Sequence, residues 1–304
     1  MIALSTAWRQ SDRNDVPATL EAARALGFEC VEIGVSGARF RLKKAQKAVG
    51  KLGLEVVSIH NVCNEKRPQD DNERGDWLGS PDPELRRQGV EATRETLAHA
   101  EALGAKAVVL HIGSPPIEDR WEKRELLCRL VAGGKAAEAE YGVTPADLLA
   151  EREAVAPEYF EAACDSIGEL LADDSKVRLG VECRVGYHEV PSFEEAAALF
   201  ERYPDPRLGY WHDTGHAAIQ EAMGRVEQFE WLRRFRGRVV GVHLHDVVRR
   251  ERLVDHYPPG LGYLDLARVR ELLPASVICV MEVSSRFIAE EVAMGLEHLR
   301  SVGF

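Results

Sequence analysis

Val177-Arg178-Leu179-Gly180-Val181-Glu182 is a short apolar run that ends in a glutamate, and Val277-Ile278-Cys279-Val280-Met281-Glu282 repeats the pattern later in the chain. Two further runs, 207–213 and 239–245, end in His212-Asp213 and His243-Leu244-His245. A charged side chain at the end of a buried strand is costly unless it is paired or holds a metal. We therefore expect one shared site, formed by a quartet of residues: Glu182, Asp213, His243 and Glu282.

Apolar runs of strand length alternate with amphipathic segments of helix length along the whole chain. This alternation predicts parallel strands joined by right-handed crossovers. Eight such units favour one α/β domain over 1–304, a closed (β/α)8 TIM barrel, with a doubly wound open sheet as the alternative. The predicted strands are 2–7, 28–33, 54–60, 107–111, 177–182, 207–213, 239–245 and 277–282; the predicted helices are 16–26, 39–52, 84–102, 156–173, 192–203, 265–273 and 286–301, with helical segments within 215–236.

Residues 115–154 separate the fourth predicted strand from its own helix and look helical, with interruptions at Gly133-Gly134 and Gly142. Such an inserted helical segment lies on the face of a barrel that carries its chemistry. It is a candidate lid or a contact in a homo-oligomer, and a passive surface insertion is an equal alternative. Residues 61–83, with the acidic run Asp70-Asp71-Asn72-Glu73, and residues 247–262 are predicted to be loops.

The composition is ordinary for a soluble globular protein, and cytoplasm is the expected location. The net charge of −11 argues against general affinity for nucleic acid or an anionic membrane. The six cysteines form no Cys-x-x-Cys pair, which is typical of buried thiols in a reducing compartment. No apolar stretch approaches the ~20 residues that span a bilayer, and the first residues lack the features of a signal peptide.

Carboxylate and imidazole ligands suit a divalent metal, Mn²⁺, Co²⁺, Mg²⁺ or Zn²⁺, and the absence of thiolates argues against a structural zinc site. The metal would polarise a carbonyl and stabilise an enediolate as it forms. Glu182 and Glu282 could then move protons on and off carbon from either side of the substrate. Asp213 would mainly neutralise charge.

Further polar residues lie at or beyond the predicted strand ends, where they could bind additional metal or contact substrate. A lone buried histidine is more often a hydrogen-bonded core residue than a ligand, and we keep that interpretation for His99, His212 and His298. His188 stays open. The candidates close to the quartet are Glu32, His60, His111, His216, His245 and His256.

The order of these short motifs resembles the xylose-isomerase-like barrels, the superfamily that holds sugar isomerases and epimerases, inosose dehydratase and endonuclease IV. The resemblance covers essentially the whole chain except 115–154. The motifs that carry it are His111-Ile112-Gly113-Ser114, Val181-Glu182-Cys183, His212-Asp213-Thr214-Gly215-His216, His243-Leu244-His245-Asp246, Pro259-Gly260-Leu261-Gly262-Tyr263-Leu264-Asp265 and Met281-Glu282.

The ketose 3-epimerase pattern within this superfamily implies a sugar or polyol isomerase/epimerase with one Mn²⁺, Co²⁺ or Mg²⁺ on the quartet. Glu182 and Glu282 would be its acid/base pair, and His216 and Arg249 would contact oxygens of a sugar or sugar-like substrate. A keto-sugar dehydratase on the same centre is an alternative that the sequence does not separate. The Asp246 that follows His243-Leu244-His245 favours His243 as the ligand.

The endonuclease IV pattern implies a different enzyme, a zinc phosphodiesterase with three zinc ions and an Asp-x-His pair. Here Val254 stands where the aspartate of that pair is expected, and Asp255 lies one place off. The arginines 249, 250 and 252 could clamp a phosphate or carboxylate or form an ordinary charged loop. A binding barrel without turnover is a third class, against which the intact quartet argues. The residues that match the endonuclease IV pattern are His60, His111, Glu182, Asp213, His216, His243, His256 and Glu282.

Overall fold

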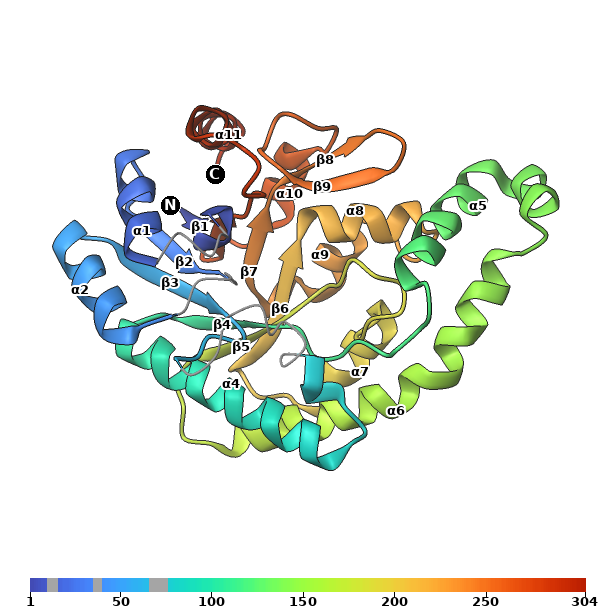
Figure 1. Cartoon of the computed structure of the whole chain (residues 1–304), viewed down its shortest axis with the longest axis horizontal. Helices are drawn as coiled ribbons and strands as arrows, with labels where there is room; N and C mark the ends of the chain where they lie inside the picture. Colours follow the sequence, from blue (N-terminus) through green and yellow to red (C-terminus); the bar gives the residue numbers. More distant parts are fainter. Residues whose placement is uncertain (10–15, 35–39, 66–75) are drawn as a thin grey trace.

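The structure is a computed structural model that describes residues 1–9, 16–34, 40–65 and 76–304. Parallel strands close into a barrel in the order β1-β10-β7-β6-β5-β4-β3-β2, seen at the centre of Figure 1. This closure confirms the predicted (β/α)8 barrel and excludes the open sheet. The barrel strands are β1 (Ile2–Ser5), β2 (Cys30–Ile33), β3 (Glu55–His60), β4 (Ala107–Leu110), β5 (Arg178–Glu182), β6 (Leu208–Asp213), β7 (Val239–Leu244) and β10 (Ile278–Met281).

Helices connect the strands, and their ends follow local chemistry. The side chain of Asp82 accepts hydrogen bonds from the backbone N–H groups of Glu84 and Leu85, and Pro83 occupies the first turn of α4. Gly104 ends α4 in the left-handed region, with φ 74°. The helices around the barrel are α1 (Val16–Ala25), α2 (Leu42–Leu52), α4 (Pro83–Leu103), α6 (Pro145–Ala172), α7 (Phe193–Arg202), α8 (Thr214–Ala222), α9 (Glu230–Phe235), α10 (Leu266–Leu272) and α11 (Ala289–Ser301).

A large aromatic side chain fills the barrel below the predicted site. Trp211 of β6 is fully buried, and a Cβ at Gly241 would lie only 2.2 Å from its ring. A Cβ at Gly180 would lie 2.9 Å from the same ring. The glycines on the two flanking strands therefore leave the space that the indole needs. The ring centroid of Trp211 lies 5.1 Å from that of His243, so the indole lies directly against the predicted site.

The segment between β4 and β5 is helical, as predicted. It contains α5 (Arg120–Tyr141), whose backbone breaks at Gly134, and Gly142 ends this helix in the left-handed region. The next helix, α6, begins at Pro145 behind a capping box of Thr144 and Asp147. It continues without interruption through the helix predicted at 156–173, so residue 154 lies inside α6. In Figure 1, α5 and α6 (green) lie at the outer edge of the molecule on one side of the barrel.

The prediction of a loop over 247–262 was wrong. The chain forms an antiparallel hairpin there, β8 (Asp246–Arg249) and β9 (Leu253–Tyr257), with Val248 opposite Val254. The strands are short and their connection is a run of charged residues, so no turn signal marks the hairpin. The acidic run 70–73 lies outside the described residues. Among the described helices, none has the combination of length and apolarity that crossing a bilayer requires.

Candidate metal centre

The quartet converges at one end of the barrel, as the sequence predicts. Ligand atoms of Glu182, Asp213, His243 and Glu282 all lie within 4.8 Å of one another, and all four residues are buried. Nδ1 of His243 is central: it lies 2.8 Å from Oε1 of Glu182, 3.2 Å from Oε2 of Glu282 and 3.7 Å from Oδ2 of Asp213. Three carboxylates so close together repel one another unless a cation offsets their charge.

Glu32 of β2 contacts the second nitrogen of the His243 imidazole, Nε2. Its two carboxylate oxygens lie 3.3 Å from Nε2 of His243, and Oε2 also accepts a hydrogen bond from the Ser58 hydroxyl at 2.8 Å. Burial disfavours the charged imidazole, but the carboxylates of Glu282, Glu32 and Glu182 outweigh it and hold the pKa of His243 well above its usual value. A carboxylate on the second nitrogen is the usual way of orienting a metal-binding histidine.

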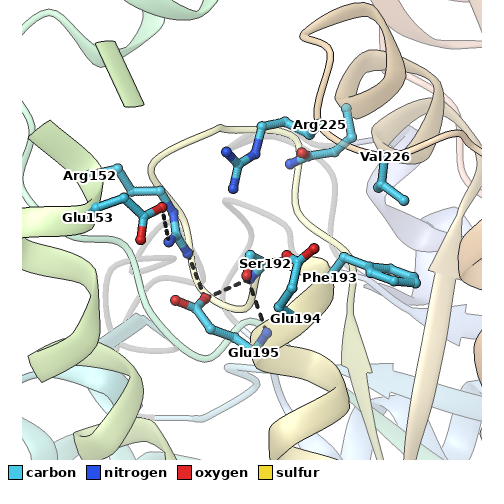
Figure 2. A pocket seen from close by; sticks show the side chains of 9 residues that line it. Arg152, Glu153, Ser192, Phe193, Glu194, Glu195, Arg225 and Val226 are labelled. Atoms are coloured by element: carbon cyan, nitrogen blue, oxygen red, sulfur yellow. Dashed lines mark hydrogen bonds and ion pairs between the residues drawn. The ribbon is translucent and has the colours of Figure 1, made fainter. Parts of the chain in front are cut away.

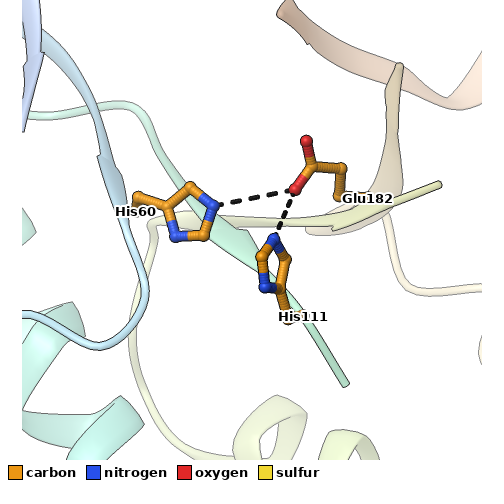
Figure 3. A group of neighbouring side chains, drawn as sticks. All are labelled: His60, His111 and Glu182. Carbon is orange, nitrogen blue, oxygen red and sulfur yellow. Dashed lines mark hydrogen bonds and ion pairs between the residues drawn. The ribbon is translucent and has the colours of Figure 1, made fainter. Parts of the chain in front are cut away.

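Two histidines lie next to Oε2 of Glu182, while its other carboxylate oxygen, Oε1, contacts Nδ1 of His243. His60, at the end of β3, and His111, directly after β4, both point their imidazoles at Oε2 of Glu182 (Figure 3). The Nε2 atoms lie 3.6 Å and 2.7 Å from that oxygen. Burial, with the positive charge of Arg184, lowers the pKa of His111 to about 3, so its imidazole is neutral. These three residues form a group with the spacing of metal ligands.

A third group lies where α8 meets the hairpin. It consists of His216, Asp255 and His256, whose ligand atoms lie within 4.8 Å of one another. Nδ1 of His256 lies 3.3 Å from Asp255, and Nε2 lies 3.5 Å from Oε2 of Glu282. The backbone of His256 adopts a φ of 55°, a left-handed conformation that is uncommon for a residue with a side chain. Asp255 thereby reaches this group although it precedes His256 directly.

His245 contacts Asp213 rather than the quartet's central histidine. Its Nε2 lies 2.9 Å from Oδ1 of Asp213, and its Nδ1 accepts a hydrogen bond from the backbone N–H of His256 at 3.0 Å. Because Nδ1 accepts, the proton is on Nε2, which donates to the carboxylate. His245 thus orients Asp213. Ligand atoms of His245, Asp213 and His256 also lie close enough together to hold a metal ion.

Sequence reasoning missed a chain of buried charges that ends at Glu182. Arg184 lies 3.7 Å from Oε2 of Glu182 and pairs with Glu189. Arg152 of α6 donates to the Glu189 carbonyl at 3.3 Å and to Glu195 at 2.6 Å. One sequence signal existed for Arg184, because a residue two places beyond Glu182 points to the same side of an extended chain.

A cavity of about 410 Å³ lies beside this chain of charges. Figure 2 shows the paired Arg152 and Glu195, with the guanidinium of Arg225 pointing into the cavity from the far side. Gln220 also lines it and donates to the carbonyl oxygen of Arg184 at 2.8 Å. Gln220 therefore connects the lining of the cavity to the backbone of the segment that carries Arg184.

The remaining candidates lie elsewhere. Arg249 is exposed at the end of β8, with its guanidinium 5.9 Å from the ring centroid of Tyr263, and within the described residues it forms no ion pair with the quartet. His99 and His212 are buried and hydrogen-bonded, to the Cys63 carbonyl and the Tyr210 hydroxyl respectively. His188 is fully buried, and its ring lies edge-on to that of Trp121 on α5.

The donor set fits one or more divalent cations. The quartet offers three carboxylates and one imidazole, a set that suits Mn²⁺, Co²⁺, Mg²⁺ or Zn²⁺. The three other groups share residues or contacts with the quartet. The group of His60 and His111 shares Glu182, the group of His245 and His256 shares Asp213, and the group of His216, Asp255 and His256 contacts Glu282 through His256. A cation at the quartet would polarise a carbonyl oxygen beside two carboxylates that can carry protons.

A family model described as xylose isomerase-like TIM barrel matches residues 20–302 of the chain. No curated protein matches it by sequence. Among solved structures, 3-keto-D-glucoside 4-epimerase from E. coli is 16% identical with a TM-score of 0.67, over 99% of this chain and 98% of that chain. D-psicose 3-epimerase with D-tagatose from Clostridium cellulolyticum H10 is 14% identical, also with a TM-score of 0.67, over 99% and 98%.

The IolI protein with a zinc atom is 15% identical with a TM-score of 0.64, over 99% of this chain and 97% of that chain. At these identities the likeness extends to the fold, which agrees with the closed barrel.

Proposed function

We propose that this chain, which belongs to the xylose isomerase-like TIM barrel family, is a divalent-metal-dependent isomerase or epimerase of a sugar or polyol. The observation that carries the proposal is the buried quartet, in which Glu182 and Glu282 both lie against Nδ1 of His243. The sugar epimerases among its structural neighbours support this choice of reaction.

The two glutamates supply the proton chemistry. The carboxylate of one removes the proton from the carbon next to the substrate carbonyl, and the other, which enters the step protonated, gives its proton to that carbon from the opposite face, which inverts it. Return of the proton to the neighbouring carbon would give an isomer instead. A divalent cation on the quartet would polarise the carbonyl and so make the carbon–hydrogen bond more acidic.

The surrounding residues fix this geometry. Burial opposes the charged form of Glu182, but His243 and His111 outweigh it and hold the pKa of Glu182 well below its usual value, so its carboxylate is ionised. Arg184, 3.7 Å from Oε2 of Glu182, adds a fixed positive charge beside the same carboxylate. The closed barrel and Trp211 exclude water from below.

The test replaces Glu182 or Glu282 by Gln and measures turnover of a panel of ketoses and keto-polyols with Mn²⁺, Co²⁺, Mg²⁺ or Zn²⁺. Turnover should be lost in both variants while circular dichroism stays unchanged. Glu29→Gln, at an exposed position before β2, is the matched control and should retain full activity. Full turnover in both site variants would refute the proposal. A product that is lighter than its substrate by one water molecule would identify a dehydratase acting on the same centre.

One observation favours a second candidate, a zinc phosphodiesterase. The structure brings His216, Asp255 and His256 together as a group beside the quartet, and His60, His111 and Glu182 form a group on its other side. Three adjoining groups could hold a multinuclear zinc centre of the kind that clamps a phosphodiester. Cleavage of DNA containing abasic sites by zinc-loaded protein would support this candidate, and no cleavage with zinc at saturation would remove it.

A further inference from the structure

Two adjoining pockets form a trough between α5 and the β8–β9 hairpin. The inner pocket has a volume of about 230 Å³ and the outer pocket about 350 Å³. Glu125, Arg252 and Leu253 line both pockets, so the two lie next to each other. Both walls of the trough are excursions from the barrel: the helix inserted after β4, and the hairpin that follows β7.

The inner end of the trough reaches the metal centre. Asp255 lines the inner pocket and belongs to the group with His216 and His256. Trp121 lines the same pocket and is 43% exposed; the guanidinium of Arg124 lies 5.3 Å from its ring centroid, and the exposed part of the ring can pack against the apolar face of a sugar. A ligand in the inner pocket therefore contacts a residue of the metal centre directly.

The outer end of the trough is rich in arginine. Arg129, Arg249, Arg250 and Arg252 line the outer pocket, against two glutamates, Glu125 and Glu251. One of these carboxylates is already neutralised, because Arg124 pairs with Glu125 at 2.6 Å. Within the part of the chain that the structure describes, the hairpin arginines 249, 250 and 252 form no ion pair with a carboxylate. The local charge is thus positive in a protein whose net charge is −11.

We propose that this trough binds the phosphate group of a phosphorylated sugar, with the sugar over Trp121 and the phosphate among the hairpin arginines. The span fits: Asp255 and Arg252 are three residues apart on the hairpin, about 10 Å in an extended strand, which is comparable to a sugar with a terminal phosphate. Guanidinium groups match phosphate oxygens with charge-assisted, paired hydrogen bonds. The sugar part of this inference rests on the proposed function; the phosphate site does not.

The test uses two readouts and a matched pair of variants. Calorimetry with inorganic phosphate reports the site without turnover, and KM values for ketoses with and without phosphate report it during turnover. Arg249→Gln together with Arg252→Gln should weaken phosphate binding and raise KM for the phosphorylated ketose at least about tenfold. Arg234→Gln together with Arg236→Gln removes two exposed arginines outside the trough and should change neither value.

The outcomes separate the two proposals. Phosphate binding that is lost in the Arg249/Arg252 variant supports the trough even if no ketose is turned over, in which case only the proposed reaction falls. Turnover without phosphate binding, and with equal KM for both ketoses, overturns the trough and leaves the reaction standing. A stronger preference for a sugar carboxylate, or for duplex DNA, that depends on the same two arginines also overturns the phosphate assignment.

Discussion

Both carboxylate oxygens of Glu32 lie 3.3 Å from Nε2 of His243, while Nδ1 of the same imidazole faces the other members of the quartet. The ring is therefore held between carboxylates from two strands of the barrel wall, β2 and β5. Ser58 holds Glu32 in turn through a 2.8 Å hydrogen bond. Glu32 thus fixes which nitrogen of His243 is available to a cation.

Replacing Glu32 by Gln should weaken divalent-metal binding by about 10- to 100-fold, because the imidazole loses the charge that orients it and raises its basicity. Calorimetric titration with Mn²⁺ or Zn²⁺ measures the change, and the far-ultraviolet circular dichroism should stay that of the wild type. Glu29→Gln, three residues earlier and exposed, is the control. Unchanged affinity in the Glu32 variant would show that the carboxylate does not orient the ligand.

Replacing both His60 and His111 by Asn should reduce the zinc bound at saturation by about one ion per chain, because Glu182 then lacks both flanking imidazoles while the quartet is intact. Elemental mass spectrometry after dialysis against zinc buffer gives the count. His298→Asn, on α11, controls for non-specific loss. Equal zinc content in the double variant and the wild type would mean that this group holds substrate rather than metal.

Replacing Arg152 by Ala should lower the free energy of unfolding by about 3–5 kcal/mol, because it leaves the buried part of Glu195 and the Glu189 carbonyl without their partner. The comparison is Arg202→Ala, whose pair with Glu161 is exposed at 42% and 59%, and which should cost less than about 1 kcal/mol. Urea unfolding measures both. If the free energy of unfolding fell by similar amounts in the two variants, the burial of Arg152 would not be what makes its loss costly.

The buried His188 should make the protein less stable in mild acid. Burial, opposed by Glu189 and aided by nearby arginines, lowers the pKa of His188 from 6.5 to about 4. Between these values the unfolded chain binds a proton that the folded chain does not, so the free energy of unfolding falls as pH falls from 6.5 to 4. This residue contributes at most about 3 kcal/mol to that fall.

His188→Gln removes the group that binds this proton. The free energy of unfolding should therefore fall less between pH 6.5 and 4 in the variant than in the wild type. Urea unfolding at several pH values between about 4 and 6.5 tests it. Part of the pH dependence of the free energy of unfolding should persist in the variant, because burial also lowers the pKa of His212 to about 4. A variant with the full wild-type slope would show that His188 is already protonated in the folded protein.

Much of the barrel could be predicted because buried parallel strands are apolar runs of uniform length, and their ends carry the chemistry. The quartet followed from position alone: Asp213 lies two residues beyond Trp211, which fills the barrel, and Glu282 follows the buried Val280 in the same way. Alternation along a strand fixes the side to which each residue points.

The hairpin and the buried arginines could not be predicted in this way. The turn of the hairpin is a run of charged residues, and β8 and β9 are too short to show alternation clearly. Arg152 is buried because Glu195, 43 residues later, lies beside it, and no local pattern reports such a partner. Asp255 lies one position away from the aspartate expected there, and it still joins the group, next to a residue, His256, with a left-handed backbone that no sequence pattern signals.

The left-handed backbone of His256 also has a conformational cost. A side chain in the left-handed region costs about 1 kcal/mol, which glycine would avoid. However, His256→Gly would also remove the imidazole that lies 3.3 Å from Asp255 and 3.5 Å from Glu282, and the loss of a partner for two carboxylates outweighs the gain. The fold thus keeps an unfavourable backbone conformation at His256 for the sake of its side-chain contacts, and a variant that retains an imidazole there should keep the group with His216 and Asp255 intact.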